Sequence, residues 1–488
     1  MSIPEKTRKS AQDMRMLLDP RTIDGKTRLH GMIWATLTVF LISVVMIFEW
    51  IVNFAGYSYY TRLLATFVTI LSCLPWIRYC ALARFKDYPF FEFHCLFNAL
   101  CYGYAGFRPT VLRAALTEEM TQNGLLASLL AVIGSYFGYY VLGRLLGAGI
   151  RPFRTGIQDS TWSCVLGLGW SVFVISLIFA FQFVGISAMN QLYKFVLFFA
   201  VTLWGTWCFS GMAKKIWRFI FIGALSIPIG MAFLAEGSIG YILGASTPIC
   251  VIYMWSNKRI IMWPLIVIFA FIILFQPIKN TYRSIVLHEG MSRDEQFQVF
   301  KELLKVQHEA GQSAREQFER SFLRMNHLMS LSMVMRDTPS VEPYEKGATY
   351  WPIFVKWIPR VLWPNKPLED IGNRWARRYG YIDQNDYITS FNLPWFAEYY
   401  MNFGWSGMIL IPIVIGIIFR LITIKFGVNR LTIYDFSFGY PVLMAIGGGE
   451  SNFSMVFGGL IVGGICMAIL ILPFIIWLRR NQYVRLAK

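Results

Sequence analysis

Hydrophobic residues along this chain are grouped in long blocks that short polar stretches separate. A helix that crosses the roughly 30 Å hydrocarbon core of a bilayer takes about 20 apolar residues, and twelve blocks approach that length. The pattern therefore predicts an all-α polytopic membrane protein with about twelve transmembrane helices. The predicted spans are residues 31–55, 62–77, 88–106, 124–146, 161–183, 191–210, 217–234, 237–255, 261–276, 402–420, 433–449 and 453–478.

Three of these blocks are weak as membrane spans. Polar interruptions set them apart: 62–77 runs into Arg78, 88–106 contains Glu92 and His94, and 433–449 contains Asp435 and three consecutive glycines. Polar groups are tolerated at membrane depth where they are buried in protein or line a cavity. We therefore expect these blocks to be re-entrant or buried against other helices, and ten spans is the alternative count.

Composition and charge agree with a membrane protein. Of the residues, 56% are hydrophobic and 15% charged, against about 25% charged in soluble domains, which excludes a soluble enzyme and a disordered chain. The net charge of +17 first suggests a nucleic-acid partner. However, 25 of the 45 basic residues line alternate segments between spans, as the positive-inside rule requires. This excludes nucleic acid and predicts that both termini are cytoplasmic.

The same alternation predicts the domain organisation. Residues 1–30 and 479–488 are cytoplasmic tails, 31–276 hold the first nine spans, 402–478 hold the last three, and 277–401 form one large extracytoplasmic loop. The loop holds 16 Lys and Arg against 15 Asp and Glu. Long translocated loops do not obey the positive-inside rule, so these basic residues need another explanation.

Two amphipathic helices are predicted inside the loop. Residues 292–310 and 313–335 each open with a serine followed three residues later by a glutamate, the spacing of a capping box. The second helix would place Arg320, Arg324 and His327 on one face. That face is either an anion-binding or catalytic surface or a solvated polar face.

Further candidate side chains lie at the ends of the loop and in its proline-rich part. Four prolines interrupt residues 350–367, so this stretch cannot form a long helix and would hold its basic residues at fixed positions. A carboxylate at a membrane edge is costly unless it is paired. The candidates are Lys279, Tyr282 and Arg283 after the ninth span, Arg360, Trp363 and Lys366 in the proline-rich part, and Glu398 and Tyr399 before the tenth span.

This set of residues suits one kind of chemistry. The sequence contains no nucleotide-binding motif and no cluster with metal-ligand spacing, so a substrate would arrive already activated in the bilayer. Arginine binds phosphates in bidentate fashion and neutralises developing charge, which predicts a lipid diphosphate leaving group and needs no metal or other cofactor. His327 or Glu398 would accept the proton of an attacking hydroxyl, and aromatic faces would hold sugar rings.

Four loop elements together resemble the oligosaccharide repeat-unit polymerases, which are the O-antigen and exopolysaccharide polymerases of bacterial envelopes. The elements are Lys279-x-x-Tyr-Arg283, Thr338-Pro339, Pro359-Arg360-x-x-Trp363-Pro364-x-Lys366-Pro367 and Glu398-Tyr-Tyr-x-Asn-Phe-Gly404-Trp-x-Gly407. The resemblance implies the C-type glycosyltransferase superfold, the bacterial inner membrane and a periplasmic loop. It also implies polyprenyl-diphosphate-linked glycans as donor and acceptor, an inverting reaction, and a chain-length regulator as a candidate partner. One departure is that Gly237-Ser238-Ile239 stands where relatives often have a Gly-Ser-Arg element.

The sequence thus leads to a glycan polymerase as the main hypothesis. The resemblance places the family's essential arginines at Arg283, Arg360 and Arg324. The predicted catalytic residues are His327, Glu398, Arg283 and Arg360, and the predicted substrate-binding residues are Lys279, Tyr282, Arg320, Arg324, Lys366, Trp363 and Tyr399. An O-antigen-type ligase would use the same donor, and a lipid-linked glycan transporter or flippase is the alternative of another class. A transporter is less favoured because the two halves show no repeat and charges inside the spans are scarce.

Overall fold

We describe the protein from a computed structural model. It describes residues 24–52, 56–107, 116–157, 165–174, 190–236, 239–260, 282, 293–309, 325–358, 362–366, 369–387, 389–427, 432–446 and 449–486. Every regular element in these ranges is helical, which confirms the predicted fold class at that level. The helices are α2 (Gly25–Val52), α3 (Tyr59–Ala81), α4 (Phe90–Asn98), η2 (Ala99–Gly103), η3 (Tyr104–Phe107), α6 (Glu118–Tyr136), η4 (Phe137–Leu142), α7 (Gly143–Leu146), α9 (Asn190–Phe209), α10 (Ile216–Glu236), α11 (Ile239–Asn257), α13 (Arg293–Glu309), α15 (His327–Asp337), α16 (Pro352–Val355), α17 (Ile371–Arg378), α18 (Trp395–Ile422), η6 (Thr423–Gly427), α19 (Ile433–Ile446), α20 (Phe453–Leu470) and α21 (Leu472–Leu486).

Five helical stretches in the described ranges are long and apolar enough to cross a membrane. They are Gly25–Ile51, Tyr59–Ala81, Glu118–Leu146, Trp395–Gly427 and Phe453–Arg480. Helices α9, α10, α11 and α19 coincide with four further predicted spans, whereas residues 261–276 lie outside the described residues. The total of twelve spans stays a prediction.

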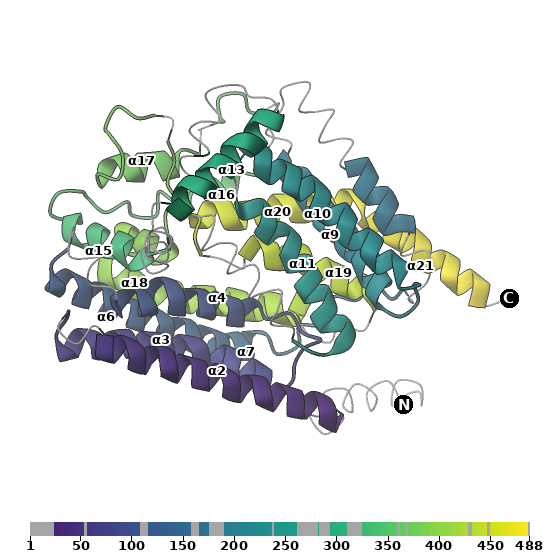
Figure 1. Cartoon of the computed structure of the whole chain (residues 1–488), viewed down its shortest axis with the longest axis horizontal. Helices are drawn as coiled ribbons and strands as arrows, with labels where there is room; N and C mark the ends of the chain where they lie inside the picture. The colour runs from purple at the N-terminus through teal and green to yellow at the C-terminus, as the bar shows by residue number, and fades with distance from the viewer. Residues whose placement is uncertain are drawn as a thin grey trace.

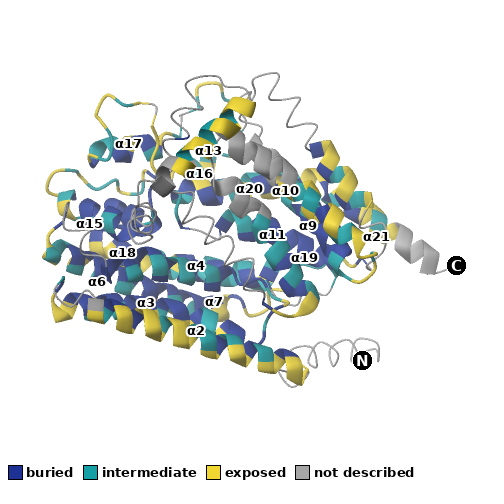
Figure 2. Ribbon diagram, in the orientation of Figure 1, coloured by how far each residue is buried: buried dark blue, intermediate teal, exposed yellow. Residues whose placement is uncertain are grey.

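The helices form one bundle whose two ends differ in character. Helix α2 begins and α21 ends at the same end of the bundle, whereas α15 and α17 lie at the opposite end (Figure 1). The outer side of α2 is exposed along its length (Figure 2) and carries apolar side chains such as Phe40 and Ile47, which are 60% and 59% exposed. An exposed apolar stripe of this length is the surface that lipid would cover.

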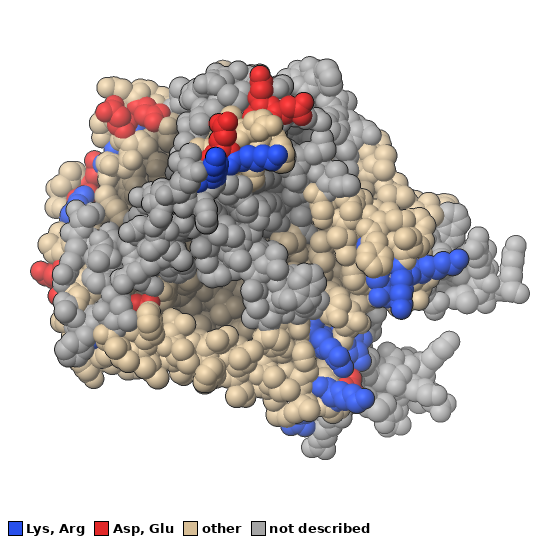
Figure 3. All heavy atoms as spheres, viewed as in Figure 1, with Lys and Arg blue, Asp and Glu red and all other residues tan. Residues whose placement is uncertain are grey.

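Basic side chains gather at the end where α2 begins (Figure 3). The turns and helix ends there expose Lys26, Arg28, Lys214, Lys215, Lys258 and Arg259. This clustering is what the predicted alternation of charge requires. That this end is cytoplasmic stays a prediction.

Two of the three weak blocks are buried inside the bundle. Residues 90–107 form three consecutive helical pieces, α4, η2 and η3, in which Glu92 and His94 are only 4% and 2% exposed. In α19, Asp435 accepts hydrogen bonds from the Thr155 amide and hydroxyl at 2.8 and 3.0 Å. Burial against protein, one of the expected outcomes, therefore explains their polar residues. The third weak block instead lies within the full-length helix α3.

Glycines bring α18, which carries Glu398, against the α6–η4–α7 helix. A Cβ atom at Gly138 would clash with the Ile413 carbonyl group, and one at Gly416 with the Ser135 carbonyl oxygen. The glycines that face α18 are Gly134, Gly138 and Gly143, and Gly147, directly after α7, faces Ile424 of η6. The π-helical stretch η4 adds one residue to a turn, so that these glycines stay on one side of the helix. Close backbone approach through small residues is how membrane helices pack tightly.

The predicted loop helices are partly confirmed. Helix α13 occupies almost all of the predicted segment 292–310. A single helix over 313–335 is wrong, because Asn326 is non-helical (φ −81°, ψ 80°) and its side chain accepts a hydrogen bond from the Met329 amide. Asn326 therefore caps a new helix, α15, that begins at His327. One continuous helical face cannot join His327 to residues 320 and 324.

Candidate functional site

The candidate site lies where α18 begins, at the end of the bundle opposite the start of α2 (Figure 1). This helix opens after Pro394 and changes direction at Gly404, which has a positive φ of 59°. A side chain there would also meet the Tyr344 hydroxyl 2.6 Å from its Cβ atom. Only glycine adopts this backbone without strain, so Gly404 separates a short first segment of α18 from the long apolar remainder.

Glu398 lies in that first segment and is completely buried. Its Oε2 atom accepts a hydrogen bond of 2.7 Å from the Phe453 amide, the first residue of α20. Its Oε1 atom makes no well-aligned hydrogen bond among the described residues, although the Thr349 side chain also interacts with this carboxylate. Because Phe453 begins a helix long enough to span a membrane, the Glu398 carboxylate lies level with the start of that span.

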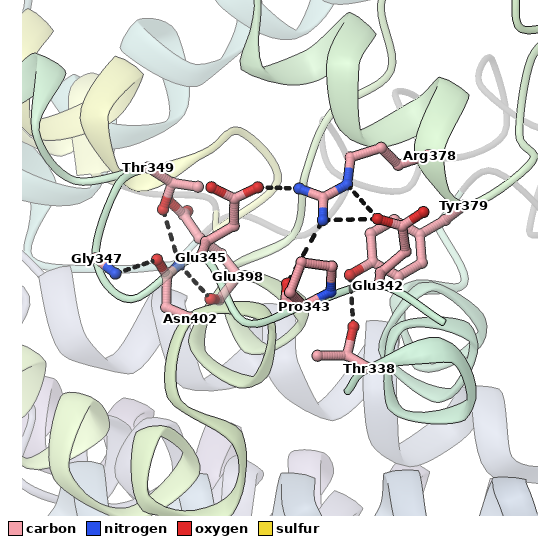
Figure 4. Close-up of polar contacts among 10 residues, drawn as sticks. All are labelled: Thr338, Glu342, Pro343, Glu345, Gly347, Thr349, Arg378, Tyr379, Glu398 and Asn402. Carbon is pink, nitrogen blue, oxygen red and sulfur yellow. Dashed lines mark hydrogen bonds and ion pairs between the residues drawn. The ribbon is translucent and has the colours of Figure 1, made fainter. Parts of the chain in front are cut away.

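Asn402, one turn after Glu398, ties the site to the preceding loop (Figure 4). Its side-chain amide donates to the Thr349 hydroxyl and to the Glu398 carbonyl oxygen, both at 2.8 Å, and its Oδ1 accepts from the Gly347 amide at 2.8 Å. Every hydrogen-bonding position of this buried amide is then used except one lone pair. The loop at residues 345–349 is therefore fixed against α18.

Two buried tyrosines, Tyr350 and Tyr399, lie close enough to Glu398 to interact with its charge, and Tyr102 lies close to Tyr399. The hydroxyls of these three tyrosines make no well-aligned hydrogen bond among the described residues. The Tyr102 ring stacks on Phe396, two residues before Glu398 on α18, at 4.3 Å. Burial raises the pKa of Tyr350, and the nearby Glu398 carboxylate raises it further. We call Glu398 and these three tyrosines the unpaired cluster. Buried polar groups normally have partners, so such a cluster requires an explanation.

A second carboxylate, Glu369, reaches the same helix start. It accepts a 2.7 Å hydrogen bond from the Ser454 hydroxyl and forms a 2.6 Å ion pair with Lys356. Asn452 in turn donates to the Ser454 hydroxyl at 2.6 Å. Two acids therefore approach the positive end of α20, where negative charge is stabilised. They differ in that Glu369 is paired with a cation, whereas no ion pair to Glu398 is found among the described residues.

Arg378 of α17 holds the loop ahead of Thr349 (Figure 4). It donates to Glu342 at 2.8 Å and also pairs with Glu345. Burial alone would lower the pKa of Arg378, but the two carboxylates outweigh that effect and raise it. Arg378, Glu345, Thr349 and Arg374 line a shallow crevice beside Met401 of α18.

Replacing Arg378 by Met should loosen this loop. Because Glu342 and Glu345 would be left facing each other without their cation, we expect a loss of about 1–2 kcal/mol in stability. The measurement is thermal unfolding of the purified protein. Arg374→Met is the matched control, because Arg374 lies on the same helix with no ion pair among the described residues. Equal melting temperatures for the two variants would contradict this account.

His327 is buried beside Tyr102 of the unpaired cluster, and no hydrogen bond or ion pair joins it to Glu398 among the described residues. It is 4% exposed, and its ring contacts Phe97 and Tyr102 edge-on at 5.2 and 5.8 Å. Burial lowers the pKa of His327 to about 3, so the imidazole is neutral at physiological pH. A general base works best with a pKa near the operating pH, so the lowered pKa of His327 makes it a poor candidate for the base.

The other predicted residues have mixed outcomes. Lys366 donates to the carbonyl oxygens of Lys356 and Ile358 at 2.8 and 3.0 Å, so its ammonium group ties a loop together. Tyr282 is buried against Phe300 of α13, and Trp363 is half-buried. Of the predicted substrate-binding residues that the structure describes, Tyr399 is the one that lies close to Glu398. The predicted residues that lie outside the described residues are Lys279, Arg283, Arg320, Arg324 and Arg360.

The sequence did not lead us to the hydrogen bonds and ion pairs that hold Glu398 and the loop before α18 in place. Asn402 is four residues after Glu398, and this helical spacing was a signal. Arg374, Arg377 and Arg378 form a basic group within one short helix, which was also visible. Nothing local connects Glu398 with Phe453, because 55 residues separate them.

Comparisons with known proteins add a family but no activity. A family model described as a domain of unknown function (DUF8712) matches residues 156–429, more than half of the chain. The matched region contains the loop, α17 and Glu398, whereas Phe453 lies beyond it. No curated protein and no solved structure matches the chain. In the part of the chain that the structure describes, no three His, Cys, Asp or Glu side chains are grouped so that they could hold a metal ion.

Proposed function

The chain belongs to the DUF8712 family, and we propose that this member is a membrane glycosyltransferase that joins polyprenyl-diphosphate-linked oligosaccharide repeats into a polysaccharide. The donor and the acceptor would both be anchored in the bilayer. Their sugars would meet near the start of α18, at the end of the bundle opposite the start of α2. In a bacterium this end would lie outside the inner membrane.

The observation that carries the proposal is the unpaired cluster at the start of α18. Glu398 has one carboxylate oxygen without a well-aligned hydrogen bond, at the level where a candidate membrane span begins. The hydroxyls of Tyr350 and Tyr399 beside it, and of Tyr102 next to Tyr399, also make no well-aligned hydrogen bond among the described residues. Hydroxyl-rich substrates could complete these hydrogen bonds, and local violations of polar satisfaction are expected at functional sites.

The reaction would proceed by direct displacement. The Glu398 carboxylate accepts the proton of an acceptor sugar hydroxyl while that oxygen bonds to the anomeric carbon of the donor. The bond from the anomeric carbon to the diphosphate oxygen breaks, and polyprenyl diphosphate leaves with the electron pair. Attack from the opposite side inverts the anomeric centre. Arg283, Arg324 and Arg360 are the proposed partners of the leaving diphosphate, whose charge guanidinium groups neutralise.

The proposal is tested with purified protein in liposomes that contain the lipid-linked repeat units of the source organism. We expect the protein alone to lengthen these units into a ladder on a gel. Arg283→Ala and Arg360→Ala should each remove the ladder at unchanged protein level. If both variants give normal yield and chain length, the assignment of these arginines is wrong.

A strain that lacks the gene separates a polymerase from a ligase, and the liposome assay separates both from a transporter. Accumulation of single repeats would support a polymerase. Loss of surface glycan with intact lipid-linked polymer would support a ligase instead. Movement of lipid-linked repeats across the liposome membrane without any lengthening would support a transporter.

A further inference from the structure

A short segment of the loop exposes three large aromatic side chains. Around α16, Trp351, Phe354 and Trp357 are 59%, 66% and 52% exposed. Phe354 and Trp351 contact each other, with ring centroids 6.1 Å apart. The Trp357 indole N–H donates to the Phe354 carbonyl oxygen at 2.7 Å, so the polar edge of this ring is satisfied locally. We call these three residues the aromatic shelf.

The opposite side of the same segment is fixed to α20. The Lys356 side chain crosses α20 at Gly458, where an added Cβ atom would lie 2.5 Å from the Lys356 Cδ atom. Its ammonium group then reaches Glu369 in a 2.6 Å ion pair, and the Lys356 side chain is 14% exposed. Ile353 packs on the main hydrophobic core. The segment is therefore held firmly on one side, and the aromatic shelf faces away from the protein.

The contact with Gly458 fixes the height of the shelf along α20. Phe453 begins a stretch that is long and apolar enough to cross a membrane and that ends at Arg480. Arg479 and Arg480 are exposed at its far end. Since a span needs about 20 residues, the first turns of α20 lie at the opposite boundary of the hydrocarbon. Gly458 lies in the second turn, close below that boundary.

Helix α20 also exposes apolar side chains. Met455, Ile461 and Ile465 are 39%, 41% and 41% exposed, as expected for the lipid-facing side of a span. The segment that carries the shelf is therefore attached to a helix that itself presents apolar surface. Tryptophan is enriched at the boundary between headgroups and acyl chains, because its ring is apolar and its N–H is polar.

We propose that the aromatic shelf inserts into the phospholipid interface at the bilayer surface farthest from the start of α2. The bound partner is the boundary of headgroups and acyl chains. The shelf would hold Lys356, and through it Glu369 and the start of α20, at a fixed height in the membrane. This inference goes beyond the proposed glycan transfer, because it concerns only where the loop meets lipid.

Photocrosslinking tests the insertion directly. Phe354 is replaced by p-benzoylphenylalanine in the full-length protein, which is then placed in nanodiscs of phosphatidylethanolamine and phosphatidylglycerol. Tyr387 is the matched control, because it is a similarly exposed aromatic residue (70%) on the α17 side, with Arg377 4.1 Å above its ring. After irradiation, mass spectrometry counts phospholipid adducts. We expect adducts at position 354 in several-fold excess over position 387.

Adducts at position 354 that are no more frequent than at position 387 would overturn the proposal. Trp357 provides a second labelling position if the Phe354 variant does not fold. Crosslinks from position 354 to another protein would likewise overturn it. The experiment contains no glycan, so its failure is distinguishable from failure of the proposed glycan transfer.

Discussion

Replacing Glu398 by Gln should lower the rate of polymerisation about 10²–10⁴-fold, which is the range that general acid–base catalysis contributes. The glutamine oxygen can still accept the Phe453 amide hydrogen bond that Glu398 now accepts. The side chain therefore keeps its shape and its contact with α20 but cannot accept the proton of a sugar hydroxyl. The measurement is the rate of chain growth in liposomes, together with the thermal unfolding temperature of the variant.

Glu450→Gln is the matched control for this prediction. Glu450 lies in the turn before α20 and accepts a 2.9 Å hydrogen bond from Asn392, near the surface. The same chemical change at that position should leave the rate nearly unchanged. Glu398→Gln that polymerises at the normal rate would show that Glu398 only caps α20.

The second large effect concerns the contact between the α6–η4–α7 helix and α18. Gly138→Leu would drive a side chain into the Ile413 carbonyl group of α18, which cannot move aside as a flexible side chain could. Overpacking of this kind typically costs about 1–3 kcal/mol and occasionally more. We expect a clear fall in the unfolding temperature in detergent and less folded protein in the membrane.

Gly464→Leu is the control for packing at a glycine. Gly464 lies on an exposed side of α20, with no atom within 4 Å of a Cβ atom built there. The same substitution should therefore leave stability nearly unchanged or raise it, because leucine favours helix over glycine. Equal losses of stability in the two variants would contradict the account that the close crossing at Gly138 determines the effect.

The hydrophobic pattern predicts the helices well, because a membrane span has to be both long and apolar. The weak block 62–77 lies in a helix, α3, that is as regular as its neighbours. The prediction fails where one residue decides a boundary. Asn326 interrupts the predicted helix because its side chain accepts a hydrogen bond from the Met329 amide, and hydrophobic periodicity does not register a cap.

The site is only partly visible in the sequence. Glu398 was identified because a carboxylate at a membrane edge is unusual, and that signal is local. Its partner Phe453 could not be identified, because the hydrogen bond uses a backbone amide that any residue other than proline would offer. Lys366 was assigned to substrate on charge alone, and the carbonyl oxygens that it contacts leave no mark in the sequence.

The bend at Gly404 also divides a helix that is longer than one crossing of a bilayer needs. Helix α18 and η6 together run from Trp395 to Gly427 as 33 residues, which at 1.5 Å per residue is about 50 Å of helix. The hydrocarbon core is about 30 Å thick, so a straight helix would carry a long surplus. The stretch after the bend, residues 404–427, is about 36 Å long and sufficient for one crossing. The surplus is residues 395–403, and both Glu398 and Asn402 belong to it, so the bent helix carries this carboxylate on the segment that a single crossing does not need.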